Sequence, residues 1–81
     1  MEGLGKKIRM LRRMRDKSQR DIARACGVSF DTYRRWEKGL QEPRATMLCR
    51  LARLFGVTVL EVLDGYREED TEASADTTGG R

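Results

Sequence analysis

The chain has 81 residues, which is enough for one small domain with a modest core. It contains no histidine and only two cysteines, which excludes the usual zinc sites, and it lacks an apolar run long enough for a membrane helix. Its 17 Lys and Arg and 13 Asp and Glu give a net charge of +4.

The charge is unevenly distributed along the chain. Residues 6–53 carry fifteen basic and five acidic side chains, a balance of +10, whereas residues 54–81 carry two basic and seven acidic ones, a balance of −5. A basic body suggests a polyanionic partner, although the charge alone fits a merely soluble surface equally well. The N-terminus lacks the apolar run of a secretory signal, so we expect a cytoplasmic protein.

The first predicted helix covers about residues 4–15. Its apolar side chains recur at the spacing of one helical face: Leu4, Ile8, Leu11 and Met14. A second helix is expected after Ser18, whose hydroxyl suits an N-cap, and it runs to residue 25 or 26. Gly27 follows at the place where a left-handed residue ends a helix at little cost.

A third helix is expected over residues 29–38, with Ser29 as its N-cap and Gly39 at its end. Tyr33 and Trp36 lie three positions apart and define its buried face, while its other side exposes polar and basic residues. Two short helices joined by a tight turn, with the second helix polar on one side, suit a helix laid into the major groove of DNA.

A fourth helix is expected over about residues 44–55, started by Pro43, which needs no amide partner there. Its core stripe consists of Leu48, Leu51, Ala52 and Phe55. The two cysteines, Cys26 and Cys49, are interpreted as reduced thiols that act as small apolar fillers on helix faces.

Thr58 and Glu61 have the spacing of a capping box, which predicts a short fifth helix over residues 59–64. Val62 and Leu63 of this helix are expected to face the core. Residues 66–81 show no apolar periodicity, so we expect an acidic, disordered tail after one domain over residues 1–65.

These elements carry a resemblance to a known family. The segments IRMLRR, SQRDIA, GVS, WEKG, EP, LARLFGV and EVL are similar, in sequence and spacing, to the helix-turn-helix domain of phage repressors and Cro proteins. The resemblance implies an all-α fold: a compact bundle of five helices, of the lambda repressor type. It also implies that the second helix lies across the DNA backbone and the third enters the major groove.

The resemblance implies two sets of DNA-contacting residues. Base-reading positions correspond to Phe30, Asp31 and Arg35, and we add Arg34 to the predicted base-reading set because it lies on the same outer face. Phosphate-binding positions correspond to Ser18, Gln19, Ser29, Thr32, Lys38 and Arg44. An ion pair between Arg12 and Glu37, joining the first and third helices, is also frequent in the family, although it could be a weak surface pair. Tyr33 departs from the aliphatic residue common there, and Glu42 weakens any expectation of a minor-groove contact.

The chemistry of the base-reading residues leaves alternatives open. Arg35 can donate two hydrogen bonds to a guanine, a contact that discriminates by about 1–3 kcal/mol. Asp31 can accept from a cytosine amino group, or it can hold an arginine in position, which we favour. Phe30 is suited to a thymine methyl or to partial burial against the second helix. Arg34 is suited to a base edge, to a phosphate or to a solvated surface position.

The sequence therefore predicts a DNA-binding transcriptional regulator, with repression as the expected mode. One recognition helix covers few base pairs, so we expect a homodimer on an inverted repeat, with Cys49, Leu54 and Leu60 at the dimer surface. The alternative is an antitoxin or accessory subunit that mainly binds a protein partner. An enzyme has little support, because the chain has no histidine, no clustered acid pair and no Gly-rich phosphate loop, and no cofactor or metal is expected.

Overall fold

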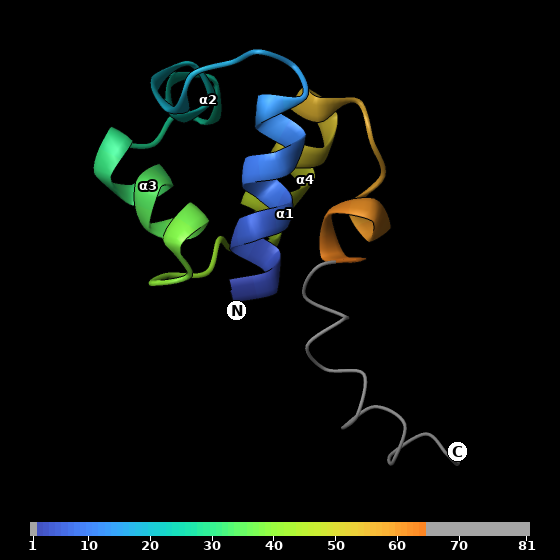
Figure 1. The fold of residues 1–81 in the computed structure, drawn as a ribbon. Coiled ribbons are helices and arrows are strands. Elements are labelled where there is room, and N and C mark those ends of the chain that lie inside the picture. Colours follow the sequence, from blue (N-terminus) through green and yellow to red (C-terminus); the bar gives the residue numbers. More distant parts are fainter. Residues whose placement is uncertain (1, 65–81) are drawn as a thin grey trace.

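The computed structural model describes residues 2–64, and within this range it contains five helical segments and no strand (Figure 1). They are α1 (Glu2–Arg13), α2 (Gln19–Cys26), α3 (Phe30–Lys38), α4 (Ala45–Phe55) and an unlabelled last segment over residues 59–64. The all-α fold expected from the sequence is confirmed. The predicted acidic tail over residues 66–81, and its boundary with the domain, lie outside the described residues. No helix of the described part is long and apolar enough to cross a membrane.

The cap residues explain where α2 and α3 begin and end. The Ser18 hydroxyl accepts from the Asp21 amide at 3.0 Å, and the Asp21 carboxylate accepts from the Ser18 amide at 3.1 Å, which forms a capping box. These hydrogen bonds with Ser18 lower the pKa of Asp21. Gly27 ends α2 with a φ of 76°, and Gly39 ends α3 with a φ of 77°. Both N-caps and both glycine ends were predicted correctly.

Three local predictions were wrong. Helix α1 ends at Arg13, so Met14 lies in the following turn with 68% of its surface exposed instead of continuing the core stripe. Pro43 does not start α4, because Arg44 is the N-cap and α4 begins at Ala45. Cys49 is exposed, so of the two cysteines only Cys26 fills the core.

The last helical segment begins as predicted but its capping box is only half formed. The Thr58 hydroxyl accepts from the Glu61 amide at 3.1 Å. The Glu61 carboxylate instead lies 3.1 Å from Nζ of Lys7 on α1, which ties the last segment to the first helix. Val62 is fully buried, as expected, whereas Leu63 is only half-buried.

One hydrophobic core joins all five helical segments. The predicted stripes of α1 and α4 meet the buried faces of α2 and α3 in a cluster made of Leu4, Ile8, Leu11, Ile22, Ala23, Cys26, Tyr33, Trp36, Leu51, Ala52, Phe55 and Val62. The rings of Tyr33 and Trp36 pack edge to face with centroids 5.8 Å apart. The core holds α2 and α3 in a fixed relation to each other, which is what a recognition surface built on both helices requires.

Helices α1 and α3 approach each other very closely at Gly5. A Cβ atom on this glycine would lie 2.5 Å from the carbonyl oxygen of Glu37 and 2.6 Å from that of Trp36. Any larger side chain would therefore push α3 away from α1. Gly5 fixes the distance between the two helices that carry the polar network described next.

Candidate nucleic-acid interface

The side chains predicted to read bases lie at the start and on the outer side of α3. Asp31 and Arg35 are exposed, whereas Phe30 and Arg34 are half-buried. Oδ1 of Asp31 lies 2.8 Å from Nη2 of Arg34, and Oδ2 lies 3.0 Å from Nε of Arg35. The hydrogen bond from Arg34, followed by the charges of both arginines, lowers the pKa of Asp31. One carboxylate thus connects two arginines, which is the arrangement favoured from the sequence.

A second arginine contact on this surface was missed by sequence reasoning. The guanidinium carbon of Arg20, on α2, lies 4.3 Å from the centroid of the Phe30 ring. This distance is that of a cation–π contact, which links the first turn of α2 to the first turn of α3. Phe30 is therefore partly covered by α2, which agrees with partial burial against the second helix, one of the two roles predicted for it. No sequence signal identifies the contact, because Arg20 and Phe30 belong to different helices.

The start of α2 is tied to α3 through the Gln19 side chain. Its Nε2 donates to Oε1 of Glu37 at 2.9 Å. The free amides of the first turn of a helix attract anions, and Ser18 and Gln19 occupy this end of α2. Gln19 was predicted as a phosphate contact, and its amide group, with two N–H donors, keeps one of them for such a contact.

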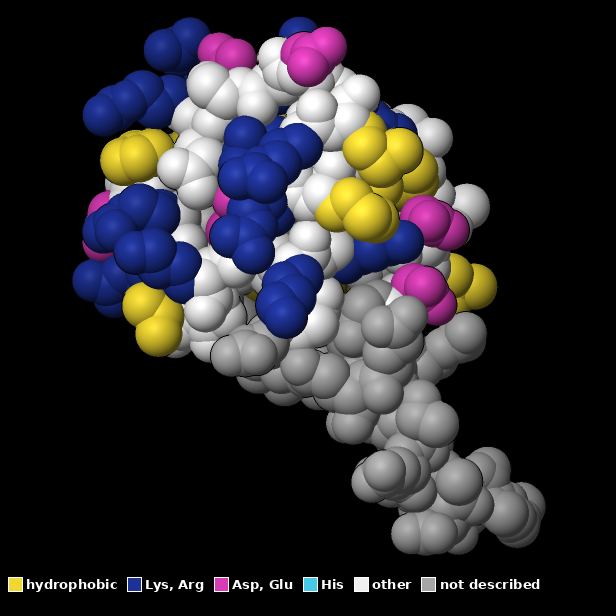
Figure 2. Space-filling view, in the orientation of Figure 1, with side chains coloured by type: hydrophobic (Ala, Val, Ile, Leu, Met, Phe, Trp, Pro, Cys, Tyr) yellow, Lys and Arg dark blue, Asp and Glu magenta, His cyan; other side chains and the backbone are white. Residues whose placement is uncertain are grey.

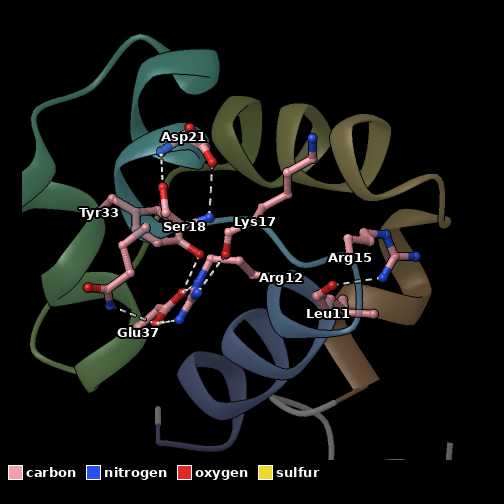
Figure 3. A network of polar contacts seen from close by, with 9 residues as sticks. Leu11, Arg12, Arg15, Lys17, Ser18, Asp21, Tyr33 and Glu37 are labelled. Atoms are coloured by element: carbon pink, nitrogen blue, oxygen red, sulfur yellow. Dashed lines mark hydrogen bonds and ion pairs between the residues drawn. The ribbon is translucent and has the colours of Figure 1, made fainter.

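Glu37 is the centre of a buried polar network between α1 and α3 (Figure 3). Its carboxylate accepts from Nε and Nη2 of Arg12 at 2.7 and 3.2 Å, and from the hydroxyl of Tyr33. Arg12 also donates to the Lys17 carbonyl at 2.8 Å. With 9% of Arg12 and 4% of Glu37 exposed, the predicted ion pair is a buried one and not a surface pair.

The network sets the protonation of its members. Burial alone raises the pKa of Glu37, but the hydrogen bonds from Arg12, Tyr33 and Gln19 together outweigh it and leave the pKa lowered. The hydrogen bond to Glu37 raises the pKa of Arg12. Burial, followed by the hydrogen bond to Glu37, raises the pKa of Tyr33 far above its ordinary value. Near neutral pH the network therefore contains a carboxylate, a guanidinium and a neutral phenol.

The other predicted phosphate-binding residues lie at the ends of α3 and α4. The Ser29 hydroxyl accepts from the Thr32 amide and donates to the Thr32 hydroxyl, both at 3.0 Å, so Ser29 acts as an N-cap. Lys38, the last residue of α3, is exposed. Arg44 is the N-cap of α4, is exposed and makes no side-chain cap hydrogen bond.

The three residues predicted at a dimer surface are all exposed, but they do not form one patch on α4. Leu54 is 41% exposed and Leu60 is 76% exposed. Cys49 and Leu54 are five positions apart on α4, which separates them by about 140° around the helix axis. Leu60 belongs to the last helical segment. The dimer surface therefore stays a prediction.

The chain matches a known protein family and is similar to a known protein. The family described as HTH_3: Helix-turn-helix matches residues 8–62, which include all of α2, α3 and α4. The chain is also 37% identical over 70 residues to the cryptic phage CTXphi transcriptional repressor RstR of Vibrio cholerae. That match covers 86% of this chain and 59% of the relative, so the chain spans about three fifths of the relative's length.

Proposed function

The chain belongs to the helix-turn-helix family, and from this premise we propose that it is a transcriptional regulator that binds specific sites in double-stranded DNA and represses transcription. The observation that carries the proposal is the outer surface of α3, where Asp31 pairs with the exposed Arg35 and with the half-buried Arg34. Such a cluster suits the base edges of the major groove. The similarity to a phage transcriptional repressor favours repression as the mode of action.

In this proposal, α3 enters the major groove and Arg35 donates two hydrogen bonds to a guanine. Asp31 forms an ion pair with Nε of Arg35 and leaves the outer N–H groups of the guanidinium for the base. Phe30, covered on one face by Arg20, presents the rest of its ring to a thymine methyl. Arg34 contacts a phosphate at the edge of the groove.

The backbone contacts are assigned to the ends of the helices. Ser18 and Gln19 bring the first turn of α2 to a phosphate, where the free amides add to the attraction. The remaining proposed phosphate contacts are Ser29, Thr32, Lys38 and Arg44. We infer that two copies bind an inverted repeat in the cytoplasm, because one α3 reads too few base pairs to specify a site.

Selection of binding sites from random duplex DNA tests the proposal directly. We expect one palindromic motif, bound with an affinity that falls steeply as the salt concentration rises because phosphate contacts release counterions. A pool that yields no motif would contradict sequence-specific binding. A single motif without a second, inverted half would contradict the proposed dimer and leave the specific contact of α3 intact.

Two variants separate base reading from backbone binding. Arg35→Ala is expected to relax the base preference at one position of each half-site, whereas Gln19→Ala is expected to weaken binding to all sequences alike. Arg53→Ala, an exposed arginine at the far end of α4, serves as the control. A selected motif that is unchanged by Arg35→Ala would show that Arg35 is not a base-reading residue.

A further inference from the structure

A basic pocket lies between α1 and α3, outside the surface assigned to base reading. It has a volume of about 480 Å³, and its lining residues are Lys6, Arg9, Glu37, Lys38 and Leu40. On the face shown in Figure 2, Lys and Arg side chains lie over α3 and along the line between α3 and α1. Three of the five lining residues are thus cations that come from two different helices.

The single acidic residue of this pocket does not neutralise the cations. Each oxygen of the Glu37 carboxylate already accepts two hydrogen bonds, from Arg12 and Gln19 on one and from Arg12 and Tyr33 on the other. Its charge is therefore compensated inside the protein by Arg12. Within residues 2–64, the ion pairs join other cations, so Lys6, Arg9 and Lys38 keep their charges available.

The position of the pocket relates it to the start of α2. Glu37 accepts from Gln19 on one side and lines the basic pocket on the other. Glu37 therefore connects the start of α2 to the pocket, which lies at the end of α3, where Lys38 is the last residue. The pocket combines cations of α1 and α3 at this end of α3.

We propose that Lys6, Arg9 and Lys38 form a binding site for a backbone phosphate of DNA, beside the phosphate held at the start of α2. This inference rests on the proposed function and extends the DNA contact from the helix-turn-helix to α1. Flexible, strongly charged side chains around an open pocket suit a phosphate, which carries no sequence information. The site therefore contributes affinity and register, and it does not contribute base preference.

The test compares two double variants that each remove two positive charges. Lys6→Gln/Arg9→Gln removes the two positive charges that α1 contributes to the pocket. Arg24→Gln/Arg53→Gln removes two exposed charges from α2 and α4 and serves as the matched control. Binding of each to the duplex selected by the unmodified chain is measured across a salt series. Circular dichroism and the urea midpoint verify that both variants are folded.

We expect the pocket variant to reduce the slope of log K against log salt by about 0.9 for each bound copy, which is the loss of one phosphate contact. Affinity falls as the salt concentration rises from about 50 to about 200 mM. For each lost phosphate contact, the factor by which it falls is expected to be about 3.5-fold smaller than for the unmodified chain. Ethylation of single phosphates in the duplex locates the contact. One ethylated phosphate, next to those that Gln19 contacts, is expected to weaken binding of the unmodified chain and to leave binding of the pocket variant unchanged. The selected motif is expected to stay the same.

Several outcomes overturn the inference while the proposed function stands. Equal slopes for the pocket variant and the control would mean that these charges act only through the overall field of the protein. An altered motif would mean that the cations read bases. If the unmodified chain itself binds no duplex, the proposed function fails first, and this distinguishes the two cases.

Discussion

Replacement of Glu37 by Gln tests whether the buried network holds α1 and α3 together. The substitution keeps the size of the side chain, so it leaves no cavity, but it removes the charge that compensates Arg12. Arg12 is 9% exposed and stays in place through its 2.8 Å hydrogen bond to the Lys17 carbonyl. The new amide also turns N–H groups toward the donor of Arg12 and toward that of either Gln19 or Tyr33, depending on which oxygen the nitrogen replaces.

The expected loss is large compared with the stability of a small domain. Breaking a buried ion pair by removing one partner costs about 3–5 kcal/mol. A chain of 81 residues has a free energy of unfolding of about 4–12 kcal/mol, at about 0.05–0.15 kcal/mol per residue. We therefore expect Glu37→Gln to be only marginally folded at 25 °C.

Urea unfolding followed by tryptophan fluorescence measures this loss, because Trp36 is the single tryptophan and is 3% exposed. Glu61→Gln serves as the control, since Glu61 is 49% exposed where it pairs with Lys7 at 3.1 Å. The control is expected to lose at most about 1 kcal/mol. A loss for Glu37→Gln no larger than that of the control would refute the assignment of a buried, energetically important pair.

A double variant identifies the source of the loss. Arg12→Met/Glu37→Leu removes both charges and replaces them with apolar side chains of comparable size. Exchanging a whole buried pair in this way is often neutral or stabilising. We expect it to recover at least half of the stability lost in Glu37→Gln. If it recovers none, the instability does not come from the uncompensated charge of Arg12.

Three further predictions use the same domain. The free energy of unfolding is expected to fall as the pH decreases from about 5 toward about 3. The pKa of Glu37 is lowered in the folded state, so the unfolded chain binds more protons than the folded chain in this range. The urea midpoints of the unmodified chain and of Glu37→Gln are therefore expected to converge in acid. Gly5→Ala is expected to lose about 1–3 kcal/mol in thermal unfolding because its Cβ meets backbone oxygens at 2.5 and 2.6 Å, and an unchanged melting temperature would contradict this. Asp31→Asn is expected to strengthen binding to scrambled DNA and to reduce the ratio of specific to non-specific affinity by about 5-fold, because Arg35 loses the carboxylate that orients it. An unchanged ratio in a gel-shift titration would show that Asp31 does not position Arg35.

Much of the fold could be predicted because the signals that define it are local. Hydroxyl N-caps at Ser18 and Ser29 and left-handed glycines at 27 and 39 act within one turn of the chain, so their effect is readable from a few neighbouring residues. The end of α1 was predicted too far along the chain because Met14 continues the apolar spacing of the helix, whereas the structure leaves Met14 68% exposed. The sequence pattern records polarity, and it does not record which surfaces meet.

The sequence by itself determined the order of the helices, the buried face of each and the outer surface of α3, because amphipathic spacing and capping depend on residues a few positions apart. Only the tertiary structure decided how Glu37 is used. Arg12, Gln19, Tyr33 and Glu37 come from three helices, and their carboxylate, guanidinium, amide and hydroxyl groups meet only when the core packs those helices together. The same packing brings Arg20 over Phe30 and places Lys6 and Arg9 beside Lys38, because contacts between helices depend on distance in space and not on distance along the chain.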